Sequence, residues 1–396
     1  MKYRFENFGG IVSSDDPPLL AFVDRQFMRE IGAGESPLWE TDDRSIGLLS
    51  APTEVHFACT NKCSVGCPHC YMDASEPDPG EMDTETFKQA LTALSEMGVF
   101  HVALGGGEAL ERDDLFDLAD HARKVGLVPN LTTSGLLVSE ENAGRMTVFG
   151  QVNLSLDGVG PLSAVFRGRD YFSQVDRAIG LLLGAGVATG INCVLGRRNF
   201  DGMPELFDYA ARKGVNEIEV LRFKPAGRAV PLYLRERTTY EQNVALMPRL
   251  QELSRQHRLT TKIDCSLIPM LCYHAPPREV LTAMATYGCE AANVLVGARS
   301  NGRVSGCSFL PDEGISVFQL KDAWNDHPRL QRLRTWAQRI CEPCASCAYL
   351  DLCKGGCHAV SASVTGNEDA PDPDCPRVVE SNRQSHYING HSSHGE

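Results

Sequence analysis

The sequence contains no apolar run long enough to cross a membrane. Its longest apolar stretch, residues 179–187, is interrupted by three glycines, whereas a membrane-spanning helix needs about 20 apolar residues. A secretory signal is missing as well, because residues 1–5 lead into acidic and proline-rich sequence rather than into an apolar segment. We therefore expect a soluble, cytoplasmic protein that has no membrane partner.

Clustered positive charge is also scarce. Lysine and arginine together number 38 against 51 aspartates and glutamates, which gives a net charge of −13. A protein that binds the phosphate backbone needs clustered basic side chains, so we expect no nucleic-acid partner. The 396 residues and the 42% hydrophobic content leave ample material for a large folded core.

Cysteine, by contrast, is abundant. A chain without an export signal is not expected to use its fifteen cysteines as disulfides, since the cytosol keeps thiols reduced. Twelve of them also lie close together in two groups, which is typical of metal binding. The first group is Cys59, Cys63, Cys67 and Cys70; the second is Cys289, Cys307, Cys341, Cys344, Cys347, Cys353, Cys357 and Cys375.

Between residues 54 and 226 the hydrophobic pattern alternates between strand and helix. We expect strands at residues 55–57, 99–104, 128–132, 148–156, 189–195 and 218–223, the last of the series. Helices are expected from Asp83, which is a good N-cap, and at 113–125, 172–183, 203–213 and 240–257. Six strand–helix repeats predict an α/β fold with a parallel sheet, namely a partial (β/α)6 TIM-like barrel whose chemistry lies at the carboxyl ends of the strands.

The pattern divides the chain into four parts. Residues 1–50 are a short-strand segment, with strands at 8–12 and 19–23 joined by a turn at 15–18 and followed by a short helix at 24–31. Residues 51–265 form the partial barrel, and 266–380 form a cysteine-rich domain. The polar residues 381–396 are expected to be a disordered tail.

Cys63, Cys67 and Cys70 follow the first barrel strand with the spacing C-x3-C-x2-C. Thiolates in such runs bind iron–sulfur clusters. Three thiolates leave one iron of a four-iron cluster open to an outside ligand, unless Cys59 is a fourth. A zinc site is the alternative, but zinc sites usually combine two paired-cysteine hooks.

This loop and its position resemble those of the radical SAM superfamily. The resemblance implies that Cys63, Cys67 and Cys70 hold a [4Fe-4S] cluster whose fourth iron binds S-adenosylmethionine (SAM). The cofactor would then supply a 5′-deoxyadenosyl radical, and the protein would orient and shield it. The residue before the third cysteine is usually aromatic in the family. Here it is His69, and Tyr71 follows, so either ring is a candidate to lie against the adenine.

The resemblance implies further SAM contacts on later strands. Gly106, Gly107 and Glu108 resemble the family's GGE motif, although Ala109 replaces the usual proline. Ser155 and Arg167 are candidates to bind the SAM carboxylate, since a hydroxyl and a guanidinium both donate to it. Weaker candidates near strand ends are Asn192 and Arg222.

The second cysteine group resembles the SPASM domain of radical SAM peptide maturases, including the closing segment 371–376. By that resemblance one auxiliary cluster is held by Cys344, Cys347, Cys353 and Cys375, and the other by Cys289, Cys307 and Cys357. The fourth position of the latter is left open or filled by another side chain, with Cys341, Cys265 and Cys272 as candidates. Cys193, in mid-strand, is expected to be only a small buried side chain. A zinc ribbon is the alternative for this region.

The two motif sets together predict a radical SAM peptide maturase that forms a new bond, a crosslink, in a precursor peptide. Its partners would be a precursor peptide with a leader, an external one-electron donor such as flavodoxin or ferredoxin, and, alternatively, a separate leader-binding protein. Residues 1–50 are a candidate leader-docking segment through strand addition. Other hypotheses are a radical SAM/SPASM enzyme that modifies a tetrapyrrole or activates a protein, a non-catalytic iron–sulfur electron-transfer protein and a zinc-dependent interaction module.

Overall fold

A ten-stranded sheet organises the protein. The computed structural model describes residues 1–15, 18–40, 42 and 48–391. In this sheet seven consecutive strands lie side by side in chain order and are all parallel. They are β4 (Glu54–Thr60), β5 (His101–Gly106), β6 (Val128–Thr133), β7 (Val152–Ser155), β8 (Thr189–Leu195), β9 (Glu217–Arg222) and β10 (Thr260–Ile263).

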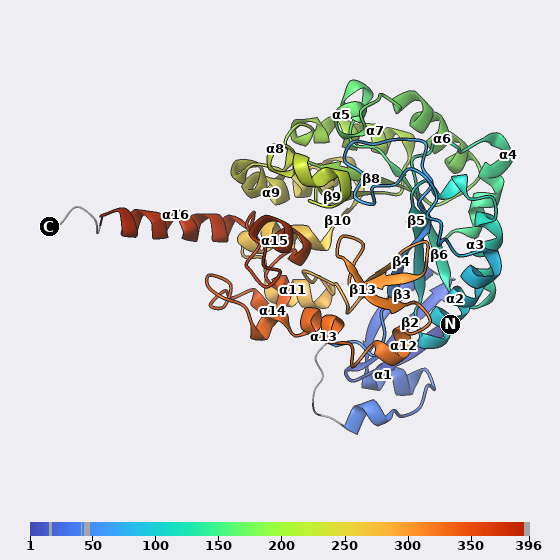
Figure 1. The fold of residues 1–396 in the computed structure, drawn as a ribbon, viewed down its shortest axis with the longest axis horizontal. Helices are drawn as coiled ribbons and strands as arrows, with labels where there is room; N and C mark the ends of the chain where they lie inside the picture. The colour runs from blue at the N-terminus through green and yellow to red at the C-terminus, as the bar shows by residue number, and fades with distance from the viewer. Residues whose placement is uncertain (16–17, 41, 43–47, 392–396) are drawn as a thin grey trace.

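Helices connect these strands and cover the outer side of the curved sheet (Figure 1). The long ones are α2 (Thr84–Met97), α3 (Leu115–Lys124), α6 (Phe172–Gly184), α7 (Met203–Lys213) and α9 (Tyr240–His257), and the short ones are α4 (Glu140–Ala143), α5 (Ala164–Arg167) and α8 (Tyr233–Glu236). Asp83 caps α2 by accepting a hydrogen bond from the Thr86 amide, and Gly98 ends the helix in the left-handed conformation. The fold is the expected α/β class with a parallel sheet.

Two strand predictions were wrong in detail. Residues 218–223 are not the last parallel strand, because β10 pairs with β9 beyond them. The strand expected at 148–156 begins only at Val152, since residues 144–148 form the 3-10 helix η3 (Gly144–Val148). Both missed elements, β10 and η3, are short. β10 has only four residues, which is too few to give a clear alternating pattern.

The same sheet continues into the cysteine-rich region. There β11 (Leu295–Ala298) lies parallel to β4, and β12 (Arg303–Ser305) and β13 (Asp312–Ser316) follow as antiparallel strands. The helices of this region are α10 (Ile268–Tyr273), α11 (Arg278–Ala283), α12 (Leu320–Ala323), α13 (Pro328–Arg334), α14 (Leu350–Cys353), α15 (His358–Thr365) and α16 (Pro376–His391). One cluster of buried apolar side chains runs from Val55 on β4 to Val360 on α15, so the two regions share a core.

A second, three-stranded antiparallel sheet forms the N-terminal segment. It contains β1 (Lys2–Glu6), which the sequence did not reveal, followed by β2 (Gly9–Asp15), β3 (Pro18–Asp24) and the helix α1 (Arg25–Glu30). The order β1-β2-β3 leaves β3 paired with β2 alone among the described residues. The turn expected between β2 and β3 includes residues 16 and 17, which lie outside the described residues.

The C-terminal tail differs from the expectation. Residues 381–391 were expected to be disordered, but they continue α16 as a helix. Residues 392–396 lie outside the described residues. Among the described residues, no helix is both long and apolar enough to cross a membrane.

Candidate active site and cysteine clusters

A cavity of about 1460 Å³ lies inside the partial barrel. Its wall includes residues from β4 to β10 and from the C-terminal cysteine-rich region. Two separate cysteine sets face it: Cys63, Cys67 and Cys70 from the loop after β4, and Cys289, Cys307 and Cys357 from the C-terminal region. The two sets that the sequence separates by more than 200 residues therefore line one continuous space.

The loop after β4 holds the first cysteine set against the end of β5. The Cys63 amide donates to the Ser75 carbonyl (2.8 Å), and the Glu108 amide donates to the Lys62 carbonyl (2.9 Å). The thiols are close enough to influence one another. Burial raises the pKa of Cys67, Arg167 lowers it, and Cys70 and Cys63 raise it further. Cys59 lies buried within β4 and apart from this loop, as expected from its place in the strand.

The donor atoms of the cysteine loop are of the kind that iron–sulfur clusters use. Among the described residues, no three histidine, cysteine, aspartate or glutamate side chains lie close enough to hold one metal ion. Soft thiolates that face a common cavity fit the donor set of an iron–sulfur cluster. All fifteen cysteines are free thiols.

His69 and Tyr71 both line the cavity but are held differently. The Nδ1 of His69 lies 2.7 Å from the Phe166 carbonyl, and the ring stacks on Phe223 with a centroid distance of 6.2 Å. Burial lowers the pKa of His69, so its Nδ1–H donates to that carbonyl from a neutral ring. The Tyr71 ring packs against Phe309 at 4.7 Å, on the side of the C-terminal region.

The glycines after β5 are needed for a close backbone approach. A Cβ at Gly107 would lie 2.1 Å from the Lys62 carbonyl oxygen, and Gly106 has a φ of +112°. Both glycines therefore bring the cysteine loop onto β5, while their backbone also faces the cavity.

The Glu108 carboxylate accepts hydrogen bonds from other residues of the protein. Its Oε1 accepts from the Thr133 hydroxyl (2.7 Å), and its Oε2 accepts from the Ser134 amide (2.8 Å). These hydrogen bonds tie the end of β5 to the end of β6. The carboxylate is thus a positioning group in this structure, although Glu108 also lines the cavity.

Arg167 and Ser155, the two candidates for the SAM carboxylate, both line the cavity. Arg167 pairs with Asp157, with 2.9 Å between Nε and Oδ2. Burial opposes the charge of Arg167, but Asp157 and Cys67 outweigh it and raise its pKa. Asp157 is therefore the counter-ion that orients Arg167 beside Cys67.

The two weaker candidates differ from each other. Asn192 is buried on β8 and lines the cavity, and its Oδ1 has no hydrogen-bond partner among the described residues. Arg222 instead bonds to Asp372 (2.6 Å between Nη1 and Oδ2) and to Asp374 (2.9 Å). Arg222 also lines the cavity, but its guanidinium is bonded to the segment before Cys375, so we do not propose it as a SAM contact.

The C-terminal cysteines separate into two sets. Burial, followed by the nearby Cys289 and Cys357, raises the pKa of Cys307 to about 12, and all three cysteines line the main cavity. A second, smaller cavity is lined by the other four expected cysteines and by one more: Cys344, Cys347, Cys353, Cys375 and Cys272. Cys341 is exposed, and Cys193 is buried in β8 as expected.

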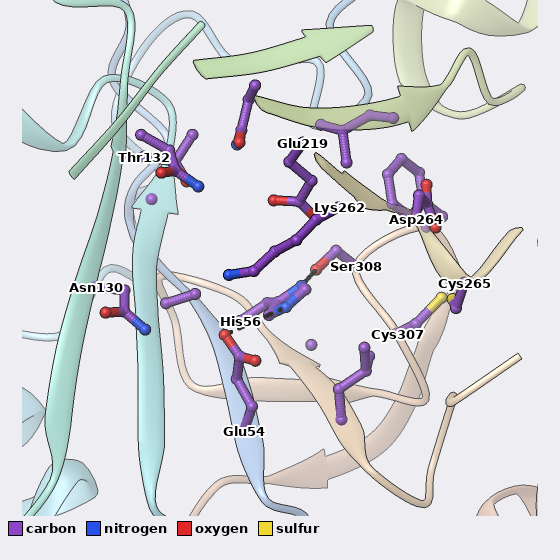
Figure 2. A pocket seen from close by; sticks show the side chains of 18 of the residues that line it. Glu54, His56, Asn130, Thr132, Glu219, Lys262, Asp264, Cys265, Cys307 and Ser308 are labelled. Atoms are coloured by element: carbon purple, nitrogen blue, oxygen red, sulfur yellow. Dashed lines mark hydrogen bonds and ion pairs between the residues drawn. The ribbon is translucent and has the colours of Figure 1, made fainter. Parts of the chain in front are cut away.

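Polar side chains on the inward faces of the strands complete the cavity, and sequence reasoning missed them. Figure 2 shows His56, Glu219 and Lys262 pointing into it from β4, β9 and β10. Lys262 pairs with Glu217 at 2.9 Å, whereas burial, followed by Asp264 and Glu54, raises the pKa of Glu219 to about 7. The sequence does carry a signal for these residues. Polar residues at every second position of a buried strand predict that the inner face of the barrel is polar.

Comparisons with known proteins agree with these features. The family model described as the radical SAM superfamily matches residues 57–210. The chain is 29% identical over 338 residues to the mycofactocin maturase MftC of Mycobacterium tuberculosis, with 83% of each chain covered. It is 27% identical to the PqqA peptide cyclase of Gluconobacter oxydans, covering 83% of this chain and 91% of the relative.

A solved structure shares the fold across nearly the whole chain. Streptococcus suis SuiB bound to its precursor peptide SuiA aligns with a TM-score of 0.71 at 18% identity, covering 94% of this chain and 98% of SuiB. At this identity the likeness shows the fold alone. The shared region includes the partial barrel and the cysteine-rich C-terminal part.

Proposed function

Since this protein is a radical SAM enzyme, we propose that it matures a ribosomally made precursor peptide by forming a new bond, a crosslink, within it. The proposal is carried by the shared cavity, in which the three-cysteine loop and three C-terminal cysteines face the same space. Relatives named as a mycofactocin maturase and a peptide cyclase support a peptide substrate.

When bound, the cluster and SAM supply a 5′-deoxyadenosyl radical that removes a hydrogen atom from a carbon of the peptide. The protein's own part is to hold and orient. Cys63, Cys67 and Cys70 would ligate three irons, and the backbone at Gly106 and Gly107 would meet the SAM amino group. Two donors, Ser155 and Arg167, would hold its carboxylate. His69 or Tyr71 would contact the adenine.

The C-terminal cysteines would hold two auxiliary [4Fe-4S] clusters. One set is Cys344, Cys347, Cys353 and Cys375, and the other includes Cys289, Cys307 and Cys357. These clusters would take up the electron released when the substrate radical closes the new bond. A tetrapyrrole or a protein substrate would use the same SAM chemistry, and these substrates are outcomes of the test given in the Discussion.

The N-terminal sheet is a candidate docking place for the peptide's leader. The outer edge of β3 has no strand partner among the described residues, and an extended peptide can add to such an edge. Pro18, Leu19 and Leu20 of β3 also line the cavity, so a peptide on this edge would lead into it. A separate leader-binding protein is the alternative arrangement. Flavodoxin or ferredoxin would supply electrons, and the free thiols suit the reducing cytoplasm.

The first test is SAM cleavage by the reduced, anaerobically loaded chain. Replacement of Cys63, Cys67 and Cys70 by alanine should abolish formation of 5′-deoxyadenosine while leaving the auxiliary iron in place. Undiminished cleavage by this triple variant would refute the site assignment. Absence of cleavage by the unaltered chain would refute the enzyme assignment.

A further inference from the structure

The auxiliary set of Cys289, Cys307 and Cys357 lacks a fourth ligand in the sequence motif, and the surrounding residues suggest where it comes from. Three cysteines remain outside the assigned sets in this part of the chain: Cys265, Cys272 and Cys341. These three cysteines lie in different parts of the structure. Cys272 lines the smaller cavity beside Cys353, and Cys341 is exposed near Cys344. Only Cys265 lines the main cavity together with the incomplete set.

We propose that Cys265 is the fourth thiolate ligand of the cluster held by Cys289, Cys307 and Cys357, so that this cluster has no iron open to the peptide. The inference rests on the proposed presence of auxiliary clusters and deepens it. Cys265 comes from the end of the barrel strand β10, 24 positions before Cys289, and not from the C-terminal motif. The cluster would thereby join the barrel to the cysteine-rich region.

The backbone around Cys265 is well fixed. Asp264 receives a hydrogen bond from the Ser266 amide (2.9 Å) and forms a buried ion pair with Lys224, and its own amide donates to the Val220 carbonyl. These contacts start the 3-10 helix η7 (Cys265–Leu267) at Cys265. Figure 2 shows Cys265 and Cys307 directing their sulfur atoms toward the same part of the cavity.

Two lysines, Lys224 and Lys354, lie near both Cys265 and a cysteine of the incomplete set. Lys224 interacts electrostatically with both Cys265 and Cys357. Lys354 interacts with both Cys265 and Cys289, and Cys265 also interacts directly with Cys289. Cys265 therefore lines the same cavity as Cys289, Cys307 and Cys357 and lies near the same two lysines as Cys289 and Cys357. A cluster with four thiolates carries net negative charge, which Lys354 would offset in part, since Lys224 is already paired with Asp264.

The Cys265 thiol suits the fourth ligand position better than the carboxylates near it. The nearby Glu290 and Asp264 offer hard oxygen donors, and iron–sulfur clusters prefer soft thiolates. Ligation requires each thiol to release its proton. A fully ligated cluster leaves electron transfer as its function and excludes direct binding of the peptide to iron.

The test uses the full chain with Cys63, Cys67 and Cys70 replaced by alanine, so that only auxiliary clusters remain. The readouts are iron and sulfide per chain and the electron paramagnetic resonance spectrum of the reduced protein, with and without cyanide as a probe of an open iron. We expect about eight iron atoms in this parent and a spectrum that cyanide does not change. Adding Cys265→Ala should either remove about four iron atoms or make the spectrum sensitive to cyanide.

Cys341→Ala, at the exposed cysteine, is the matched control and should change neither readout. Cys265→Ser preserves the side-chain size and keeps the test valid if the alanine variant fails to fold. The proposal is overturned if cyanide alters the parent spectrum, or if both Cys265 variants keep the parent's iron content and its insensitivity to cyanide. A parent with no auxiliary iron would overturn the proposed clusters themselves, which is a separate and recognisable result.

Discussion

At the scale of single residues, the cavity is defined by buried polar groups whose charges are not fully compensated. Glu219 is the clearest case, because it has no hydrogen-bond or ion-pair partner among the described residues. Its neighbours Asp264 and Glu54 add negative charge to the same space. A carboxyl group in this position is held partly protonated near neutral pH and is available to a polar group of the substrate.

Glu219→Gln should therefore stabilise the protein in a pH-dependent manner. The folded-state pKa of about 7 lies above the ordinary 4.5, so the contribution of Glu219 to stability is present below about pH 4.5 and is lost as the pH rises through 7. The glutamine variant should gain less than about 1 kcal/mol at pH 5 and on the order of 3 kcal/mol at pH 8. Thermal unfolding of the loaded protein at both pH values measures this gain.

The control is Glu252→Gln on the exposed face of α9, which should change stability at neither pH. An equal gain from Glu219→Gln at pH 5 and pH 8 would contradict the raised pKa.

The sequence predicted most of the residues that local patterns encode and missed those that depend on distant contacts. The cysteine loop, Gly107 and Arg167 were identifiable because their neighbours in the sequence signal their place. The partnership of Arg222 with Asp372 was not, since 150 residues separate the two side chains. Arg222 was consequently read as a ligand contact, although it binds the segment before Cys375.

At the scale of elements, the packing of the cysteine loop on β5 controls the position of Cys63. Gly107→Ala should displace that loop, because the added Cβ would lie 2.1 Å from the Lys62 carbonyl oxygen. We expect loss of about four iron atoms per chain together with SAM cleavage, while the auxiliary iron remains. Iron analysis of the anaerobically loaded variant tests this.

Gly144→Ala is the matched control, since an added Cβ there meets no atom within 4 Å. It should keep full iron content. If Gly107→Ala also kept full iron and cleavage, the glycine would not be needed for the loop.

The edge strand β3 offers a second test at this scale. Leu19 is 43% exposed and lines the cavity, so it is available to an apolar side chain of a docked leader. Leu19→Asp should weaken binding of the precursor peptide by about tenfold, which corresponds to about 1.4 kcal/mol. Fluorescence anisotropy with a labelled peptide measures the affinity, and SAM cleavage without peptide should be unchanged.

Leu234→Asp, at a 65% exposed leucine on α8, provides the comparison and should bind peptide normally. Equal affinities of the two variants would argue against docking on β3.

The elements themselves were predicted where the pattern is long. The helices at 172–183, 203–213 and 240–257 match α6, α7 and α9 within one residue, because each has several turns of periodic apolar positions. The strand β1 and the extra barrel strand β10 were missed. Both are short, and pairing with neighbouring strands rather than local propensity stabilises them.

At the scale of the whole molecule, Arg222 joins the barrel to the C-terminal cysteine region. Its guanidinium, on β9, is buried together with Asp372 and Asp374. Removing Arg222 leaves the buried Asp372 carboxylate without its cation, so Arg222→Met should destabilise the protein by about 3–5 kcal/mol. Thermal unfolding of the loaded chain checks the loss.

An exposed ion pair supplies the contrast. Asp351 pairs with Arg278 at the surface, and Asp351→Asn should cost less than about 1 kcal/mol. Similar losses for the two variants would mean that Arg222 does not link the regions in the way described.

The central claim is that one cavity joins SAM chemistry to a precursor peptide, and mass spectrometry tests it most directly. The reduced, loaded chain would be incubated with SAM and the small peptide encoded beside its gene. We predict formation of 5′-deoxyadenosine and a peptide about two mass units lighter, because a crosslink between two carbons removes two hydrogen atoms. Formation of 5′-deoxyadenosine with every such peptide left unchanged, while a tetrapyrrole or a protein is modified instead, would contradict the account.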